Sequence, residues 1–232
     1  MGRVVAIAGG DLKSTKQLNV HALKLSRKTN PNVLFIGTAS NDAEEYISVI
    51  KKEYNLLGCT IKSLCLVSEL YQDTDIDELL SWADVIYVGG GDTISMMNIW
   101  KQYKLDEKLK RIYEKDLAVL TGISAGAICW FTCGHSDSES FENENNWKYC
   151  WADGMLDLFH MAFCPHYNEE GRDSFDDMLM EKEMDGLAME NDTAFVEDNG
   201  DQYFLRSDCL AHAYRMAYVD GQIIKTEVTF RE

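Results

Sequence analysis

Short apolar runs alternate with segments of helical spacing through the first half of the chain. The apolar runs are residues 3–8, 33–37, 60–67, 85–88 and 117–120, each about as long as a buried strand. The segments between them that predict helices include residues 15–27, 41–57 and 75–82. Strands that alternate with helices in this way indicate an α/β fold with a parallel sheet, flanked by helices on both faces.

The C-terminal part has a different pattern. Apolar runs at residues 203–205, 213–219 and 223–230 follow one another without an intervening helix, and Asp220-Gly221 separates the last two. Asp-Gly between apolar runs is a strong hairpin signal. We therefore expect a C-terminal antiparallel extension of the sheet edge. At 232 residues, the chain is expected to form one α/β domain, residues 1–232.

Gly122-Ile-Ser-Ala-Gly126 follows the apolar run 117–120 and precedes an expected helix over residues 125–131. Gly-x-Ser-x-Gly between a strand and a helix is typical of a nucleophile elbow, which exposes the serine hydroxyl at the carboxyl end of the strand. The Ala125 amide would then supply half of an oxyanion hole beside Ser124. The pentapeptide is short, and a simple helix cap is the alternative interpretation.

A triple glycine, Gly89 to Gly91, ends the preceding apolar run. Because neighbouring strands of a parallel sheet end at the same edge, these glycines are expected opposite Ser124. The amide of Gly90 or Gly91 is the candidate for the second oxyanion-hole donor, and a tight turn is the alternative. Phosphate binding is disfavoured, since no Gly-Lys-Ser/Thr follows.

His166 is the candidate general base among five histidines. It follows a short apolar run, residues 161–164, and Pro165, which predicts a position at the same rim as Ser124. A carboxylate should orient its imidazole. The candidates are Asp137, Glu190 and Asp192, and the sequence does not choose among them.

Charge and cysteine content narrow the class of protein. The net charge of −17, from 39 acidic and 22 basic residues, argues against nucleic acid or an anionic membrane as partner. Seven cysteines in apolar surroundings suit reduced thiols in a cytoplasmic protein. Cys129, Cys133 and His135 match none of the usual zinc spacings, so we expect no metal site. A monomer or a homodimer is expected.

Five motifs occur in order, and together they resemble peptidase family S51, which includes peptidase E, an aspartyl dipeptidase, and the cyanophycinases. The resemblance covers most of the chain, from the first predicted strand to about residue 196. The motifs are Val88-Gly-Gly-Gly-Asp-Thr93, Gly122-Ile-Ser-Ala-Gly-Ala-Ile-Cys-Trp130, Gly134-His-Ser-Asp-Ser138, Cys164-Pro-His-Tyr167 and Glu190-Asn-Asp-Thr-Ala194.

The resemblance implies a flavodoxin-like fold similar to the class I glutamine amidotransferase domain, and peptide hydrolysis without a metal or organic cofactor. It implies that Ser124 is the nucleophile, His166 the base and Asp137 a charge-relay residue. Gly91 matches the oxyanion-hole loop, although Asp92 replaces the more usual asparagine.

Two departures from the family pattern concern the third triad member and the substrate. The glutamate proposed for that third position aligns most simply with Asn191, so Glu190, Asp192 and Asn191 all remain candidates beside Asp137. Arg172 is only a loose counterpart of the arginine with which peptidase E recognises a substrate aspartate, so aspartyl specificity is not expected to carry over.

The expected function is cleavage of short peptides through an acyl-enzyme on Ser124, with His166 as general base. The alternatives are a non-hydrolytic binding or regulatory module with the same fold, and an amidase or esterase that acts on a non-peptide substrate with the same residues.

Overall fold

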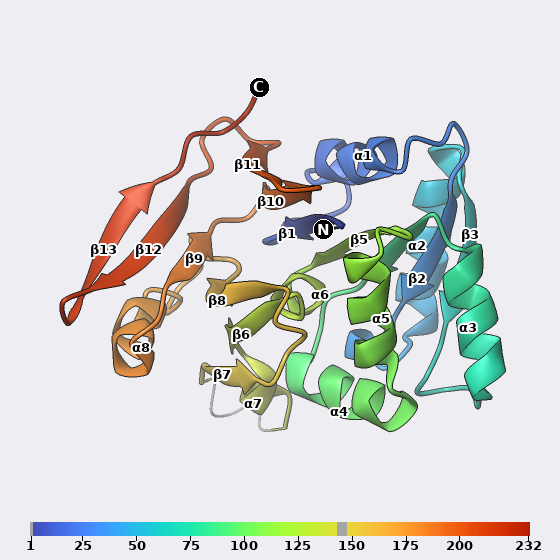
Figure 1. Cartoon of the computed structure of the whole chain (residues 1–232), viewed down its shortest axis with the longest axis horizontal. Coiled ribbons are helices and arrows are strands. Elements are labelled where there is room, and N and C mark those ends of the chain that lie inside the picture. The colour runs from blue at the N-terminus through green and yellow to red at the C-terminus, as the bar shows by residue number, and fades with distance from the viewer. Residues whose placement is uncertain (1, 143–147) are drawn as a thin grey trace.

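The structure is a computed structural model that describes residues 2–142 and 148–232, and it contains two sheets (Figure 1). The first sheet has the strand order β11-β10-β1-β5-β4-β2-β3. The strands β1 to β5 run parallel, β10 pairs antiparallel with β1, and β11 pairs antiparallel with β10. Its strands are β1 (Arg3–Ile7), β2 (Asn32–Ile36), β3 (Thr60–Leu64), β4 (Val85–Val88), β5 (Val119–Ile123), β10 (Thr193–Asp198) and β11 (Asp201–Arg206).

The second sheet has the order β13-β12-β9-β8-β6-β7, with a parallel centre formed by β6, β8 and β9. Its strands are β6 (Phe131–Ser136), β7 (Cys150–Asp153), β8 (Phe159–Cys164), β9 (Gly186–Met189), β12 (Ala213–Val219) and β13 (Gln222–Glu227). The parallel strands and the C-terminal antiparallel part are confirmed. Their division between two sheets differs from the single sheet that the pattern predicted.

Helices cover both faces of the first sheet, as predicted (Figure 1). Those on one face, α1 and α2, pack through Leu23, Ile50 and Tyr54, whereas α3, α4 and α5 pack on the other face in the largest apolar cluster. The helices are α1 (Lys16–Leu25), α2 (Glu44–Leu56), α3 (Asp73–Trp82), α4 (Thr93–Tyr103), α5 (Leu105–Glu114), α6 (Ala125–Ile128), α7 (Ser138–Glu142) and α8 (Ser174–Lys182), with a 3₁₀ turn, η1 (Thr38–Ser40).

The Asp220-Gly221 hairpin is confirmed. Val219 pairs with Gln222, which leaves a two-residue turn between β12 and β13. Asp220 and Gly221 both have positive φ, 50° and 79°, as a type I′ turn requires. This hairpin extends the second sheet and forms the arm at the left of Figure 1.

The helix expected over residues 125–131 is wrong in length, because α6 ends at Ile128 and Phe131 begins β6. Phe131 pairs with β8 and its ring stacks on Phe163, with ring centroids 4.4 Å apart. Burial of two aromatic rings in a sheet thus ends the helix after one turn.

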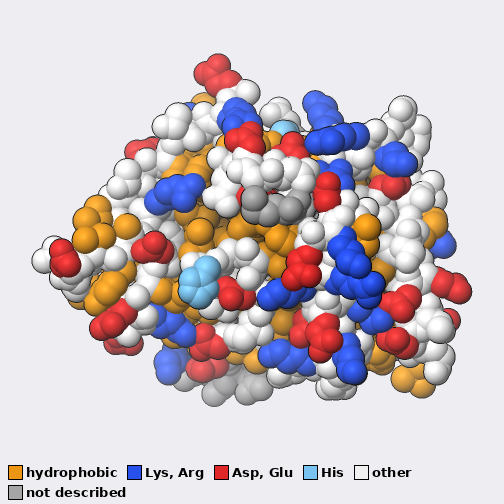
Figure 2. Space-filling model, in the orientation of Figure 1, with side chains coloured by type: hydrophobic (Ala, Val, Ile, Leu, Met, Phe, Trp, Pro, Cys, Tyr) orange, Lys and Arg blue, Asp and Glu red, His pale blue; other side chains and the backbone are white. Residues whose placement is uncertain are grey.

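Acidic and basic side chains are interspersed over the face of the molecule in Figure 2, with apolar side chains more frequent toward the C-terminal hairpin. Among the described residues, no helix is both long and apolar enough to span a membrane.

Candidate active site

Ser124 occupies the turn between β5 and α6 with φ 56° and ψ −116°, a conformation that non-glycine residues rarely adopt. The turn is tight: a Cβ on Gly122 would lie 2.1 Å from the carbonyl oxygen of Gly126. A Cβ on Gly126 would lie 2.2 Å from the carbonyl oxygen of Val88 in β4. Both flanking positions therefore require glycine, and the backbone strain presents a partly exposed serine hydroxyl.

His166 lies just beyond β8, and its Nε2 is 2.8 Å from Ser124 Oγ. Its backbone has φ 55°, which turns the chain immediately after Pro165. The two side chains come from different sheets, Ser124 from the end of β5 and His166 from the end of β8. The predicted proximity of Ser124 and His166 is thus present in the structure, although the two strands do not share a sheet.

The other ring nitrogen of His166 faces two side chains. Nδ1 is 2.7 Å from Asn191 Oδ1 and 3.2 Å from Glu169 Oε1. Asn191 Nδ2 in turn donates to Glu169 Oε1 at 3.0 Å. The hydrogen bond with His166 is the largest cause that lowers the pKa of Glu169 to about 2, and the Asn191 amide adds to it against a desolvation penalty. Glu169 is therefore ionised at neutral pH.

The triple glycine after β4 lies beside Ser124. The Gly90 Cβ position would be 3.4 Å from Ser124 Cβ, so the triple glycine faces the serine as predicted. Burial raises the pKa of Tyr46, and a hydrogen bond from the Gly90 amide opposes that effect. The amides of Gly90, Gly91 and Ala125 all remain candidates to bind an oxyanion.

Comparison with known proteins places the chain in a family. The model of peptidase family S51 matches residues 4–204. The chain belongs to peptidase family S51. An uncharacterized peptidase, YgaJ, from Bacillus subtilis (strain 168) is 30% identical to this S51 peptidase over 230 residues, which is 96% of this chain and 95% of that protein.

Two solved structures share the fold of this S51 peptidase. A peptidase from an acI-B1 actinobacterium has a TM-score of 0.76 at 17% identity, with coverage of 100% of this chain and 96% of that chain. A putative peptidase E protein from Listeria monocytogenes EGD-e has a TM-score of 0.66 at 19% identity, with coverage of 89% and 98%. At these identities the likeness concerns the fold.

The carboxylates predicted to orient His166 lie elsewhere in this S51 peptidase. Glu190 Oε2 accepts from the His212 amide at 2.8 Å, and Asp137 Oδ2 lies 3.7 Å from Arg172 Nη2. Asn191 and Asp192 form the turn between β9 and β10, and the Asn191 side chain of this turn contacts His166 Nδ1 at 2.7 Å. This corrects the prediction that Asp137 or Glu190 carries the orienting group.

Asp192, the third candidate, lies beside Gly10. It has φ 65°, and its Oδ1 lies 2.2 Å from the position of a Cβ on Gly10. This buried oxygen has no hydrogen-bond partner among the described residues. Asp92, the departure in the oxyanion loop, accepts from the Ser95 amide at 3.0 Å and caps α4.

Sequence reasoning missed Glu169. The available signal was its position, three residues after the histidine, which brings its side chain back over the imidazole if the intervening residues form a turn. The turn exists because the Glu169 amide donates to the His166 carbonyl at 2.8 Å. The residue types from His166 to Glu169 do not by themselves specify this turn.

Arg172, the loose counterpart of a substrate-binding arginine, is buried with 3% of its side chain exposed. Its Nη1 donates to the His135 carbonyl at 2.9 Å, and its guanidinium lies 4.4 Å from the ring centroid of Tyr149. Burial, and then the nearby Arg172 charge, lower the pKa of His135 to about 3, so this histidine is neutral. Arg172 therefore packs the interior and does not line an open subsite, contrary to the expectation.

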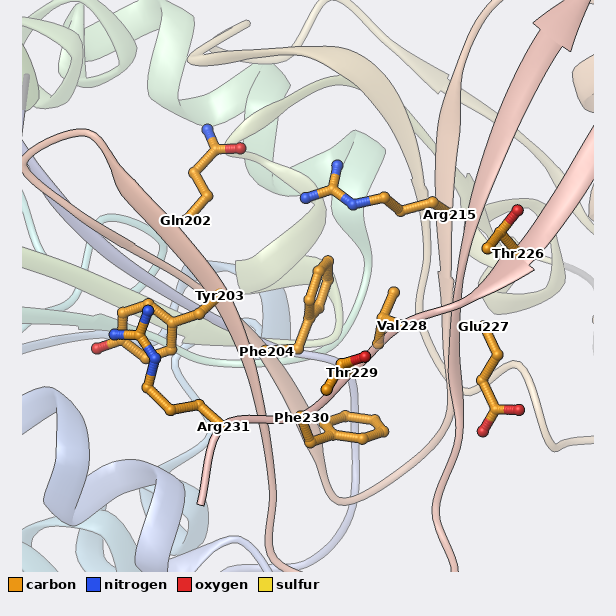
Figure 3. A pocket seen from close by; sticks show the side chains of 10 residues that line it. All are labelled: Gln202, Tyr203, Phe204, Arg215, Thr226, Glu227, Val228, Thr229, Phe230 and Arg231. Carbon is orange, nitrogen blue, oxygen red and sulfur yellow. The ribbon is translucent and has the colours of Figure 1, made fainter.

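A groove of about 530 Å³ lies between β11 and the C-terminal segment (Figure 3). The guanidinium of Arg215 lies 5.1 Å from the Phe204 ring centroid, and that of Arg231 lies 3.6 Å from the Tyr203 ring centroid. The residues that line the groove run from Gln202 to Arg231 and include neither Ser124 nor His166. The groove is therefore separate from the serine site of this S51 peptidase.

Proposed function

We propose that this S51 peptidase is a serine-type hydrolase that cleaves short peptides through an acyl-enzyme on Ser124. The observation that carries the proposal is the 2.8 Å contact between Ser124 Oγ and His166 Nε2, made at a strained strand-to-helix turn. A nucleophile within hydrogen-bond distance of a base, with the base oriented by a third group, is the arrangement that activates a serine. The side chains of both residues are partly exposed, so a substrate can reach them.

The chemistry proceeds in two halves. As Ser124 Oγ attacks the scissile carbonyl carbon, its proton passes to His166 Nε2, and the Ala125 and Gly91 amides donate to the developing oxyanion. The imidazolium then protonates the leaving amine as the C–N bond breaks, which leaves an ester on Ser124. Water repeats the sequence: His166 takes its proton, the hydroxyl attacks the ester, and the returned proton frees Ser124 as the acid departs.

The preference for short peptides rests on membership of peptidase family S51, which includes the dipeptidase peptidase E. All seven cysteines are free thiols, which supports a reducing cytoplasm as the proposed location.

The test is turnover of a panel of dipeptides with varied N-terminal side chains, together with labelling by a fluorophosphonate probe. Ser124→Ala is expected to abolish both. Ser81→Ala on the exposed surface of α3 serves as the matched control and should leave both unchanged. Labelling that persists in Ser124→Ala, or a wild-type protein that hydrolyses no member of the panel, would refute the proposal.

A further inference from the structure

The segment from His166 to Arg172 gives this chain a carboxylate in an unexpected place. A turn closed by the Glu169 amide on the His166 carbonyl brings Glu169 Oε1 to within 3.2 Å of His166 Nδ1. The neighbouring Asn168 side chain accepts from the Asn191 amide at 2.9 Å, which joins this turn to the segment after β9. Within this one turn, Glu169 thus contacts the His166 ring. Asn168 contacts the backbone of Asn191, whose side chain also contacts the ring.

Asn191 by itself is an ambiguous partner for a histidine. Its side chain offers either an oxygen acceptor or an NH₂ donor to the ring nitrogen. In serine proteases of the trypsin type, asparagine in place of the triad aspartate lowers kcat by about 10⁴-fold, because the imidazole adopts the wrong tautomer. An asparagine here works only if its oxygen is made to face Nδ1.

Glu169 removes this ambiguity. An ionised carboxylate only accepts hydrogen bonds, so Asn191 must point Nδ2 at Glu169 and Oδ1 at His166. The ring then carries its hydrogen on Nδ1 and presents the Nε2 lone pair to the Ser124 hydroxyl. The same carboxylate places a negative charge beside the imidazolium that forms when the serine proton is taken.

We propose that Glu169 is the positioning residue of this site: it fixes the orientation of Asn191 and supplies the charge that the triad's third position lacks. The proposal rests on the serine hydrolase function proposed above. Other charged groups near this turn include Arg172, whose charge lowers the pKa of Glu169, and Asp192, which lies beside Gly10. Glu170 belongs to the same segment, and Asp176 and Lys225 contact Tyr167.

The test measures the rate of fluorophosphonate labelling at Ser124 across a pH series, in folded variants. Glu169→Gln is expected to slow labelling on the order of 10²-fold, within the range of general-base contributions, and to move the acid limb of the profile to lower pH. Glu170→Gln is the matched control, since Glu170 has the same charge at the next position and is exposed. It should leave the rate and the profile unchanged.

A rescue separates the role of the charge from a structural role. Asn191→Asp in the Glu169→Gln background restores a carboxylate on Nδ1 and is expected to recover labelling to within a few-fold of the wild type. Wild-type rate and profile in Glu169→Gln would overturn the proposal, and so would a folded double variant no faster than Glu169→Gln.

The ¹⁵N shifts of the His166 ring provide a readout that does not depend on activity. The wild-type ring is expected as the Nδ1–H tautomer, and Glu169→Ala should shift it toward Nε2–H. A wild-type protein that fails to label would refute the serine hydrolase function. The tautomer of the His166 ring, read from its ¹⁵N shifts, would still test whether Glu169 orients Asn191. An unchanged tautomer in Glu169→Ala would overturn the role of Glu169 even if Ser124 labels normally.

Discussion

Gly9 follows β1 and lies directly against the histidine and its partner. A Cβ at this position would lie 2.0 Å from Asn191 Oδ1 and 2.2 Å from His166 Nδ1. Ordinary contact begins at 3.4 Å, so in Gly9→Ala the two side chains must move by roughly 1.4 Å. A misplacement of about 1 Å costs on the order of 10²-fold in rate, or about 2.7 kcal/mol of transition-state stabilisation.

The free energy of unfolding of Gly9→Ala should change little. A loss of labelling would therefore report on the site and not on the stability of the fold. The atoms that must give way are the ends of side chains, and the backbone of Gly9 is not in the left-handed region, so alanine is not strained there. Alanine at a compatible position stabilises a protein by about 0.4–1 kcal/mol through the unfolded state, and this offsets part of the displacement cost.

The assay compares the rate of fluorophosphonate labelling with the urea midpoint. Gly37→Ala is the matched control, because Gly37 follows β2 with φ −95° and its Cβ position is 3.2 Å from the Phe35 ring. A Gly9→Ala protein that labels at the wild-type rate would refute the expectation that a Cβ on Gly9 displaces His166 and Asn191. A large loss of stability with no loss of labelling per folded molecule would refute it too.

Two further predictions concern the polar cluster of Asp137 with the buried Arg172 and His135. Asp137→Asn should keep Ser124 labelling within about threefold of the wild type and lower the melting temperature, because it removes the carboxylate 3.7 Å from the buried Arg172. A loss of labelling of about 10²-fold, with the melting temperature unchanged, would restore Asp137 to the catalytic machinery. His135 is neutral when folded, with a pKa lowered to about 3 from 6.5, so the unfolded chain binds its proton first and stability falls as pH drops from 6.5 toward 3. The slope from this residue is at most about 1.4 kcal/mol per pH unit, and urea titrations at pH 7 and pH 4.5 should show a shallower loss in His135→Gln.

Features that depend on neighbouring residues were predictable from the sequence. The parallel strands, the Asp220-Gly221 hairpin and the turn around Ser124 each follow from a local pattern of apolar and small residues. The approach of Gly90 to Ser124 also followed, because adjacent parallel strands end at one edge.

Features that depend on long-range pairing were not predictable. Nothing in the apolar run of β8 distinguishes a sixth strand of the first sheet from the centre of a second one. Glu169, the carboxylate beside His166 Nδ1, was missed for a related reason. Which side chain of the short turn between β9 and β10 faces His166 depends on backbone angles that the residue types do not specify, and the same holds for the turn that brings Glu169 back to the ring.

The two sheets meet at the site, and this explains why the catalytic geometry depends on residues far from Ser124. Asn191 lies between β9 of the second sheet and β10 of the first, so the chain crosses from one sheet to the other where it contacts His166. Behind this crossing, Phe195 of β10 packs 4.9 Å from Phe159 and 6.0 Å from Phe131 between ring centroids. A close-packed aromatic interior leaves little room for one sheet to slide on the other. The 2.8 Å contact between serine and histidine is therefore set by how the two sheets pack, and the Glu169 turn then determines which ring nitrogen carries the proton.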